Sequence, residues 1–326
     1  MQYYPLLKLL ADGRLHSGAE LAGMLGVSRT AVWKQLQYLE NLGLSVEAVR
    51  GHGYRLVTSL DLLDCQRILE RIPAEMRDRV GLETLVEVES TNQRLLDVDC
   101  PNHDYEVCTA EQQTSGRGRR GRNWESPFAQ NIYLSFAYET EGAIQTLQGL
   151  TLVAGSALLN ALETLGIRDL GLKWPNDIWL RGRKVAGILT ELQGIVEDRF
   201  RVVIGMGLNV YMSDQDVSID QPWTSLANEK QVPTEGRNAI VAAVIRHLVG
   251  WLDPGVDIGS KQFLQFWREH DVLEGREITV AGETLTGTAR GIDRSGRLRI
   301  EAPSGIEKTL NAGEVSVRVA CDDSSA

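Results

Sequence analysis

Three runs of alternating apolar residues in the middle of the chain, at 172–180, 185–192 and 200–210, constrain its fold most. Each run has the length and the two-residue alternation of a β-strand. The first two are joined at Arg181-Gly182-Arg183, and the second and third by a turn around residues 197–198. Because a parallel crossover needs about a dozen residues or more, strands joined this closely are antiparallel neighbours. The sequence therefore predicts an antiparallel sheet and excludes a doubly wound nucleotide-binding sheet.

A glycine–arginine loop spans residues 116–124, with the sequence Gly-Arg-Gly-Arg-Arg-Gly-Arg-Asn-Trp. Its glycines have the spacing of a dinucleotide-binding turn, but that turn requires a helix directly after it, and residues 123–127 are poor helix starters. Arginines lie among the glycines, so we expect the loop to bind an anion through guanidinium and backbone N–H groups. A solvated loop that happens to be basic remains the alternative at this point.

The first 60 residues have the pattern of a winged helix-turn-helix. Two short amphipathic helices are expected on either side of a turn at residues 26–28, and an alternating segment after them would form the wing. This segment carries six cations and four anions, whereas the rest carries 28 cations and 40 anions, which favours a polyanion-binding head on an acidic body. The candidate DNA-binding residues are Arg29, Thr30 and Trp33 for base edges, Lys34 for phosphate, and Arg50 and His52 in the wing. A three-helix module that binds protein is the alternative.

A second constellation lies at residues 173–177 and 183–189. It places a carboxylate (Asp177), an amide (Asn176) and two lysines (Lys173 and Lys184) on adjoining strand candidates. Lysines beside apolar strand residues are costly to bury unless an anion meets them. A nucleotide phosphate or an activated carboxylate would suit this site, and ordinary strand-edge lysines are the alternative.

The remaining segments suggest three domains. Helical spacing predicts helices over residues 144–165, 239–252 and 261–270, whereas residues 276–319 contain short strands and turns typical of a small β-barrel. The expected domains span residues 1–60, 61–270 and 271–326. The four cysteines have neither Cys-x-x-Cys spacing nor neighbouring histidines, so no protein metal site is predicted. No apolar stretch approaches the roughly 18–20 residues of a membrane span.

Four separated segments together resemble the signature blocks of the biotin protein ligases. They are Ser90-Thr91-Asn92, the glycine–arginine loop, residues 173–177 and residues 183–189. With its N-terminal head, the chain resembles the bifunctional type, in which the ligase is also the biotin operon repressor. The resemblance implies an α+β protein with an N-terminal winged helix-turn-helix, a central antiparallel-sheet domain like that of class II synthetases, and a C-terminal SH3-like β-barrel.

The resemblance also implies roles for individual residues. Biotin contacts are expected from Ser90, Thr91, Asn92, Gln113, Arg117, Gly118, Arg119 and Lys184. Trp124 and Asn176 would flank the adenine, and Arg318 would help to bind the nucleotide. The expected catalytic set consists of Lys184, Arg119, Lys173 and Asp177. Residues 211–223 take the position of a flap over the adenine, but they are acidic and rich in serine, so no flap contacts are carried over.

The implied reaction uses ATP with Mg²⁺. The biotin carboxylate attacks the α-phosphate to give biotinyl-5'-AMP and pyrophosphate. A lysine of a biotin carboxyl carrier domain, as in the carrier protein of acetyl-CoA carboxylase, then takes the acyl group. As a repressor the chain would bind operator DNA as a homodimer loaded with biotinyl-AMP, in the cytoplasm and without a membrane partner. Two other functions stay open, namely a transcription factor with a non-catalytic ligand-sensing domain and a lipoate-type ligase.

Overall fold

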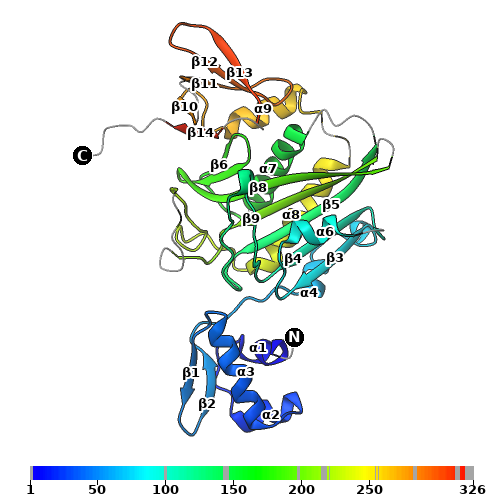
Figure 1. The fold of residues 1–326 in the computed structure, drawn as a ribbon, viewed down its shortest axis with the longest axis vertical. Coiled ribbons are helices and arrows are strands. Elements are labelled where there is room, and N and C mark those ends of the chain that lie inside the picture. Colours follow the sequence, from blue (N-terminus) through cyan, green and yellow to red (C-terminus); the bar gives the residue numbers. More distant parts are fainter. Residues whose placement is uncertain are drawn as a thin grey trace, which may run out of the picture.

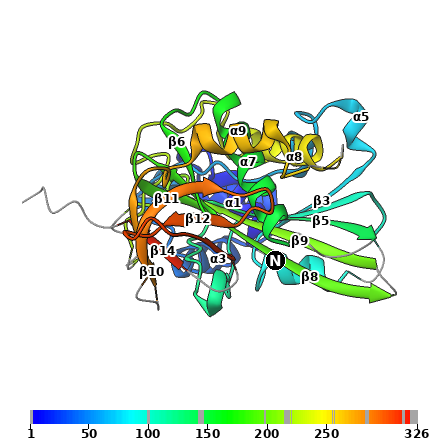
Figure 2. The ribbon, with the colours of Figure 1, turned by 90° about the horizontal axis from the view of Figure 1, so that it is seen from above.

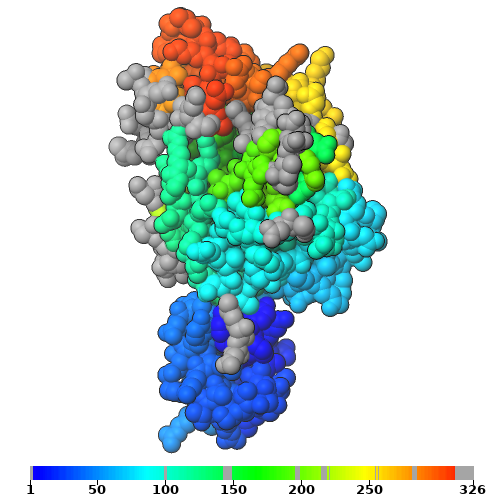
Figure 3. Space-filling view, turned by 45° about the vertical axis from the view of Figure 1, so that its right-hand side comes forward, coloured from blue at the N-terminus to red at the C-terminus, as the bar shows by residue number. Residues whose placement is uncertain are grey.

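The computed structural model describes residues 3–98, 101–141, 147–196, 199–213, 219, 221–253, 255, 257–281, 285–312 and 316–319. Figure 1 shows a small N-terminal head at one end, a central sheet domain, and the C-terminal strands at the opposite end. In the space-filling view the head forms a lobe of its own (Figure 3). Within the described ranges, no helix has both the length and the apolar composition needed to cross a membrane.

The head is the predicted winged helix-turn-helix. Its elements are α1 (Tyr4–Leu10), α2 (Gly18–Leu25), α3 (Arg29–Asn41) and the wing strands β1 (Val46–Val49) and β2 (Gly53–Leu56). Ser17 begins α2 with a capping box to Glu20, and Ser28 begins α3 by accepting the Ala31 N–H. Gly26 ends α2 in the left-handed conformation, at φ 64°, which a side chain would strain. The turn between the two helices therefore follows from the local sequence.

The central sheet has seven strands in the order β3-β4-β5-β9-β8-β7-β6. Their bounds are Val80–Leu85 (β3), Tyr105–Ala110 (β4), Ile132–Glu141 (β5), Leu170–Lys173 (β6), Asp177–Leu180 (β7), Arg183–Val196 (β8) and Arg199–Leu208 (β9). The three runs predicted as antiparallel neighbours are antiparallel neighbours. The run 172–180 was wrongly predicted as one strand. It is two strands, β6 and β7, because Pro175 has no N–H for a sheet ladder and lies in the turn between them.

One pair departs from the predicted antiparallel pattern. β3 and β4 run parallel, so the sheet is mixed. β3 ends at Leu85, and Val88 beyond it makes an isolated parallel bridge to Gln113. The segment between β3 and β4 contains the helix α6 (Thr91–Leu96) and is long enough for a parallel crossover.

Helices cover the two faces of the sheet unequally. α7 (Leu147–Thr164), α8 (Gly236–Leu252) and α9 (Lys261–His270) lie together on one side of the sheet (Figure 2). Side chains alternate along a strand, so Val107 of β4 joins the large core with α7 and α8, whereas the next residue, Cys108, joins Leu95 of α6 in a small cluster. Among the helices in the described ranges, α6 alone contributes to that small cluster. Much of this second face of the sheet is therefore available to the glycine–arginine loop.

The segment after the wing is held by a buried ion pair. The Arg237 guanidinium lies 2.8 Å from the Glu111 carboxylate, and both side chains are fully buried. Arg237 also donates to the Asp61 carbonyl, and Glu111 accepts the Leu63 N–H. Two short helices, α4 (Cys65–Leu69) and α5 (Ala74–Arg77), then lead into β3. The ion pair therefore attaches the chain leaving the head to the end of β4, which Glu111 follows directly.

The C-terminal domain is all-β, as predicted. Its strands are β10 (Glu277–Ala281), β11 (Thr286–Ile292), β12 (Leu298–Glu301), β13 (Glu307–Leu310) and β14 (Ser316–Val319). They form one antiparallel sheet in the order β13-β12-β11-β10-β14. One of its turns, before Gly296, is closed by the hydrogen bond that the Gly296 N–H donates to the Asp293 carbonyl at 2.9 Å.

Candidate active site

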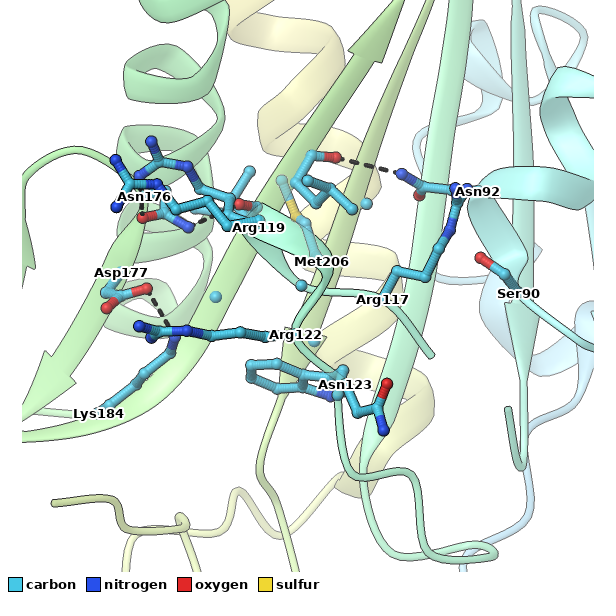
Figure 4. Close-up of a pocket in the computed structure, with 18 of the residues that line it drawn as sticks. Ser90, Asn92, Arg117, Arg119, Arg122, Asn123, Asn176, Asp177, Lys184 and Met206 are labelled. Atoms are coloured by element: carbon cyan, nitrogen blue, oxygen red, sulfur yellow. Dashed lines mark hydrogen bonds and ion pairs between the residues drawn. The ribbon is translucent and has the colours of Figure 1, made fainter. Parts of the chain in front are cut away.

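Residues from all four sequence blocks line one pocket on the face of the sheet that carries α6. The predicted small-molecule residues in its lining are Ser90, Thr91, Asn92, Gln113, Arg117, Gly118, Arg119, Trp124, Lys173, Asn176, Asp177 and Lys184. Figure 4 shows Lys184, Asp177 and Asn176 on one side of this pocket, Ser90 and Asn92 on the other, and loop side chains between them. The structure thus joins blocks that lie up to about a hundred residues apart, as expected for a site built on a folded sheet.

The glycine–arginine loop is a closed hairpin. Arg117 pairs with Asn123, and the Gly118 N–H donates to the Arg122 carbonyl at 2.7 Å. A short 3-10 turn, η1 (Arg119–Gly121), forms its tip, and no α-helix follows, as predicted. A Cβ on Gly116 would lie 2.6 Å from the Trp124 carbonyl oxygen, so only glycine allows the hairpin to close there. The loop is therefore shaped to carry its arginines over the sheet.

Glycines in the sheet make room for Trp124. A Cβ on Gly207 of β9 would lie 2.2 Å from Trp124 Cε2, and one on Gly187 of β8 would lie 3.0 Å from Trp124 Cζ3. The indole therefore lies directly against the backbone of two strands. Its Nε1 is buried and has no hydrogen-bond partner among the described residues. That N–H is free to donate to a bound ligand.

A lysine–aspartate pair forms the cationic wall of the pocket. Lys184 Nζ lies 2.8 Å from Asp177 Oδ1, and each side chain is 15% exposed. Lys184 of β8 pairs with Trp179 of β7, and Asp177 lies two residues before Trp179 on the same face of that strand, so the register brings the two side chains together. Lys184 Nζ also lies 5.4 Å from the Trp124 ring centroid, and Lys173 Nζ lies 4.7 Å from the ring of Trp179. The carboxylate holds the lysine in place while leaving its charge beside the pocket.

Arg119 attaches the loop to two other parts of the protein. Its guanidinium donates to Asn176 Oδ1 at 3.2 Å and to the carbonyl of Ala312 in the C-terminal domain. Burial, and then the charge of neighbouring Arg120, lower the pKa of Arg119 from its ordinary value. A half-buried guanidinium with no carboxylate partner among the described residues is stabilised by an anionic ligand. The C-terminal domain thus contributes directly to the position of the loop.

Neutral hydrogen-bonding groups form the other end of the pocket. The backbone N–H and the hydroxyl of Thr91 both donate to Gln113 Oε1, at 2.9 and 3.1 Å. The Ser135 hydroxyl lies 2.7 Å from Thr91 Oγ1 and 2.5 Å from Asn92 Oδ1. Ser90 is the N-cap of α6, accepting the Gln93 N–H. This end is polar but carries no net charge on these groups, so it suits an uncharged polar ring.

Comparison with known proteins identifies the chain. Residues 86–209 match the model of the biotin/lipoate A/B protein ligase family, residues 5–55 an HTH domain, and residues 275–318 the biotin protein ligase C-terminal domain. The bifunctional ligase/repressor BirA of Salmonella typhimurium is 38% identical over 319 residues, which cover 97% of each chain. The chain belongs to the bifunctional biotin ligase/repressor family. It therefore combines a ligase domain with a DNA-binding head and is an enzyme.

Two biotin ligases support the ligase part of this assignment. The biotin–[acetyl-CoA-carboxylase] ligase of Mycobacterium tuberculosis is 34% identical over 247 residues, covering 72% of this chain and 88% of its own. A solved biotin protein ligase from Aquifex aeolicus, in complex with biotin and ATP, has a TM-score of 0.63 at 28% identity and covers 74% of this chain and 99% of its own.

In this bifunctional ligase/repressor the candidate DNA-binding residues are all exposed. Arg29, Thr30, Trp33 and Lys34 lie on the first turns of α3, and Arg50 and His52 lie at the wing turn. Trp33 is 49% exposed, which is unusual for so large an apolar side chain outside an interface. The head carries these residues at the far end of the molecule from the C-terminal strands (Figure 1). Their role in DNA binding remains a prediction.

Two predicted parts of the ligase site are not described. Arg318 lies on β14, paired with Thr279 across β10, but its side chain is outside the described residues. Six of the thirteen residues of the predicted flap, 214–218 and 220, are also outside them, although Trp223 bridges to Lys184 and Gln221 lines the pocket. The flap's C-terminal end therefore lies against the start of β8 and the pocket.

Sequence reasoning assigned no role to five residues that hold the pocket side chains in place or make room for them. They are Ser135, Glu191, Gly205, Gly207 and Gly187, the last of which lies inside the block 183–189. A Cβ on Gly205 would lie 2.2 Å from Asn92 Oδ1, just as one on Gly207 would meet Trp124. The Gly205-Met206-Gly207 pattern inside a strand run was the available signal, because strand glycines often mark a close approach of another group.

Proposed function

We propose that the chain activates biotin with ATP as biotinyl-5'-AMP and transfers biotin to a lysine of a carrier domain. One observation carries the proposal. A neutral hydrogen-bonding end, with Thr91, Asn92 and Gln113, and a cationic end, with Lys184 and Arg119, belong to a single pocket. Biotin has a neutral ureido ring at one end and a carboxylate at the other, so the two ends of the pocket match the two ends of the substrate.

In the first step the biotin carboxylate oxygen bonds to the α-phosphorus of ATP, and the bond from that phosphorus to the bridging oxygen breaks, releasing pyrophosphate. Negative charge spreads over the phosphoryl oxygens as this happens. Lys184, fixed by Asp177 at 2.8 Å, and Arg119, fixed by Asn176, are positioned cations that stabilise this charge. Trp124 and Asn176 are proposed to flank the adenine, and Lys173 and Arg318 to support the nucleotide.

The pocket residues fit Mg²⁺ as an ion carried in with the phosphates. Asp177 supplies the one carboxylate in the described lining, and protein Mg²⁺ sites commonly combine one or two carboxylates with substrate phosphates. The described residues contain no group of three His, Cys, Asp or Glu side chains that would hold a metal by themselves. When bound, the ion would neutralise charge on the phosphate oxygens.

In the second step the carrier lysine amine attacks the acyl carbon of biotinyl-AMP, and AMP leaves. The mixed anhydride is already activated, so no protein nucleophile is required. The loop hairpin over the sheet would shield the anhydride from water. The acceptor is proposed to be the biotin carboxyl carrier protein of acetyl-CoA carboxylase.

The head gives the second activity. We propose that the adenylate-loaded protein dimerises and represses the biotin operon by binding operator DNA through α3 and the wing. The proposed domains span residues 1–60, 61–270 and 271–326, and the proposed location is the cytoplasm. Measurement of the mass in solution, with and without biotin and ATP, would test the dimer.

A carrier assay tests the ligase. The protein is incubated with ATP, Mg²⁺ and a carrier domain, with biotin or lipoate offered, and the carrier is weighed by mass spectrometry. A gain of one biotin supports the proposal, a gain of one lipoate supports a lipoate-type ligase, and no gain supports a non-catalytic ligand sensor. Lys184→Ala should lower pyrophosphate release by roughly 100-fold or more. Lys261→Ala, at an exposed position that begins α9, is the matched control and should retain activity.

A further inference from the structure

Glu191 binds two parts of the candidate site with one carboxylate oxygen. Its Oε2 accepts from Asn92 Nδ2 at 2.7 Å and from Arg117 Nη2 at 3.1 Å. Asn92 comes from α6 and Arg117 from the glycine–arginine loop, and Glu191 itself lies on β8. Three separate elements therefore meet at this carboxylate.

Strand geometry explains why Glu191 lies at the end of the pocket. Alternate residues of a strand share a face, so Gly187, Leu189 and Glu191 follow one another along the same face of β8. Gly187 and Leu189 line the pocket, and Glu191 is the next position along. Its side chain is 24% exposed and that of Arg117 is 42% exposed, so the ion pair lies at the rim.

The loop is thereby fixed at two points on opposite sides of the pocket. Arg119 is held by Asn176 and by the C-terminal domain, and Arg117 is held by Glu191. Figure 4 shows Arg117 reaching from the loop toward Asn92 on the far side from Asn176 and Asp177. Loss of the Glu191 contact would leave Arg117 its longer, 3.5 Å hydrogen bond to Gln93 Oε1, which would loosen one side of the loop while the other stays attached.

Glu191 also orients the side-chain amide of Asn92. Asn92 Oδ1 accepts from Ser135, and its Nδ2 donates to Glu191 and to the Leu189 carbonyl, so all three contacts fix the orientation of the amide. A Cβ on Gly205 would collide with this amide at 2.2 Å, so it has little room to adopt another position. The carboxylate that holds the loop also holds a group facing the neutral end of the pocket.

We infer that Glu191 is a positioning residue that latches the glycine–arginine loop over the biotin end of the pocket through Arg117, while it orients Asn92. The inference rests on the proposed ligase function. Glu191 does not touch the reacting atoms, and its effect is on retention of biotinyl-AMP and on the KM for biotin. The rate of adenylate synthesis at saturating biotin and ATP depends instead on Lys184 and Arg119.

The test uses the full chain loaded with biotin and ATP. After rapid gel filtration, mass spectrometry follows the loss of protein-bound biotinyl-AMP with time. Glu191→Gln keeps a side-chain oxygen for Asn92 but removes the charge that holds Arg117. It should release the adenylate about three- to tenfold faster, the size expected for a partly exposed charge-assisted contact. If Glu191→Gln fails to fold, Arg117→Met on the loop replaces it; this substitution removes the same ion pair together with the proposed biotin contact of Arg117, so release should be accelerated at least as much.

Three further comparisons make the result specific. The double variant should release the adenylate no faster than the faster single variant, because both substitutions remove the same contact. Raising the salt concentration should accelerate release from the wild type more than from Glu191→Gln. Glu83→Gln, which breaks the more exposed pair of Arg94 with Glu83 outside the pocket lining, should release at the wild-type rate.

The possible outcomes distinguish failure of the Glu191 latch from failure of the proposed ligase function. Wild-type release from Glu191→Gln, or effects of the two substitutions that multiply in the double variant, would overturn the latch while leaving the ligase intact. A wild-type protein that forms no adenylate would overturn the proposed function, and the latch with it. Fast release with an unchanged rate of adenylate synthesis at saturation is the expected result.

Discussion

Replacing Arg237 tests how the chain leaving the head is held to the catalytic domain. Arg237→Met would leave the fully buried Glu111 carboxylate without the guanidinium that lies 2.8 Å away. The Asp61 and Asn131 carbonyls would each lose the hydrogen bond that Arg237 donates at 2.9 Å. Removing one partner of a buried ion pair typically costs about 3–5 kcal/mol, because the remaining charge is buried and uncompensated.

The loss is measured by urea unfolding followed by circular dichroism and, independently, by thermal melting. A cost of 3–5 kcal/mol corresponds to a fall in melting temperature of roughly 6–20 °C for a domain of this size. Arg290→Met is the matched control, because Arg290 and Glu301 lie 2.7 Å apart but are 43% and 42% exposed. That substitution should cost no more than about 1 kcal/mol.

A second variant separates loss of the pair from loss of packing. In the double variant Glu111→Gln/Arg237→Met no charge remains buried. The side-chain amide that replaces the Glu111 carboxylate keeps an oxygen for the Leu63 N–H, so part of the lost stability should return. If Arg237→Met costs as little as Arg290→Met, or if the double variant is no more stable than Arg237→Met, the buried charge is not the source of the effect.

Three other substitutions test the site and its surroundings. Arg119→Gly removes the contacts to Asn176 and the C-terminal domain, so biotinyl-AMP should escape and label lysines indiscriminately in a mixed-protein assay; labelling confined to the carrier would contradict this. Gly207→Ala places a Cβ 2.2 Å from Trp124 Cε2, and overpacking of this kind costs about 1–3 kcal/mol. It should displace the indole and slow adenylate synthesis. Gly194→Ala is the control, because the nearest atom to its Cβ is 3.9 Å away, and it should change neither stability nor the rate. Burial raises the pKa of Asp271 to about 6, so this carboxyl stabilises the fold below about pH 4 and loses that contribution as the pH rises through about 6. The unfolding free energy of the wild type relative to Asp271→Asn should therefore fall by up to about 3 kcal/mol between these pH values. A difference that does not change with pH would refute this.

Local sequence was enough to predict the elements whose causes are local. Ser17, Gly26 and Ser28 set the ends of the head helices by capping and by a left-handed turn, and these signals work within one or two turns of chain. The short connections of the central strands likewise decided their antiparallel pairing. The resemblance to biotin protein ligases then named most of the residues that line the pocket.

Long-range pairing explains what was not predicted. β3 and β4 are parallel, but the segment between them is long enough to permit either direction, so the connection alone did not predict their pairing. The break between β6 and β7 could have been predicted, since Pro175 cannot join a ladder and marks a turn in a run read as one strand. The pairing of β10 with β14 joins segments distant in sequence at one edge of the C-terminal sheet.

The sequence by itself determined the order of the domains, the charged residues that can bind a nucleotide, and the glycines that let the loop close. Only the tertiary structure decided which groups support them. Glu191 is an unremarkable strand glutamate until β8 brings it to Arg117 and Asn92, and Ala312 gains a role only because the C-terminal domain meets Arg119. The physical reason is that a contact between distant segments depends on the register and packing of whole strands, which no short sequence window contains.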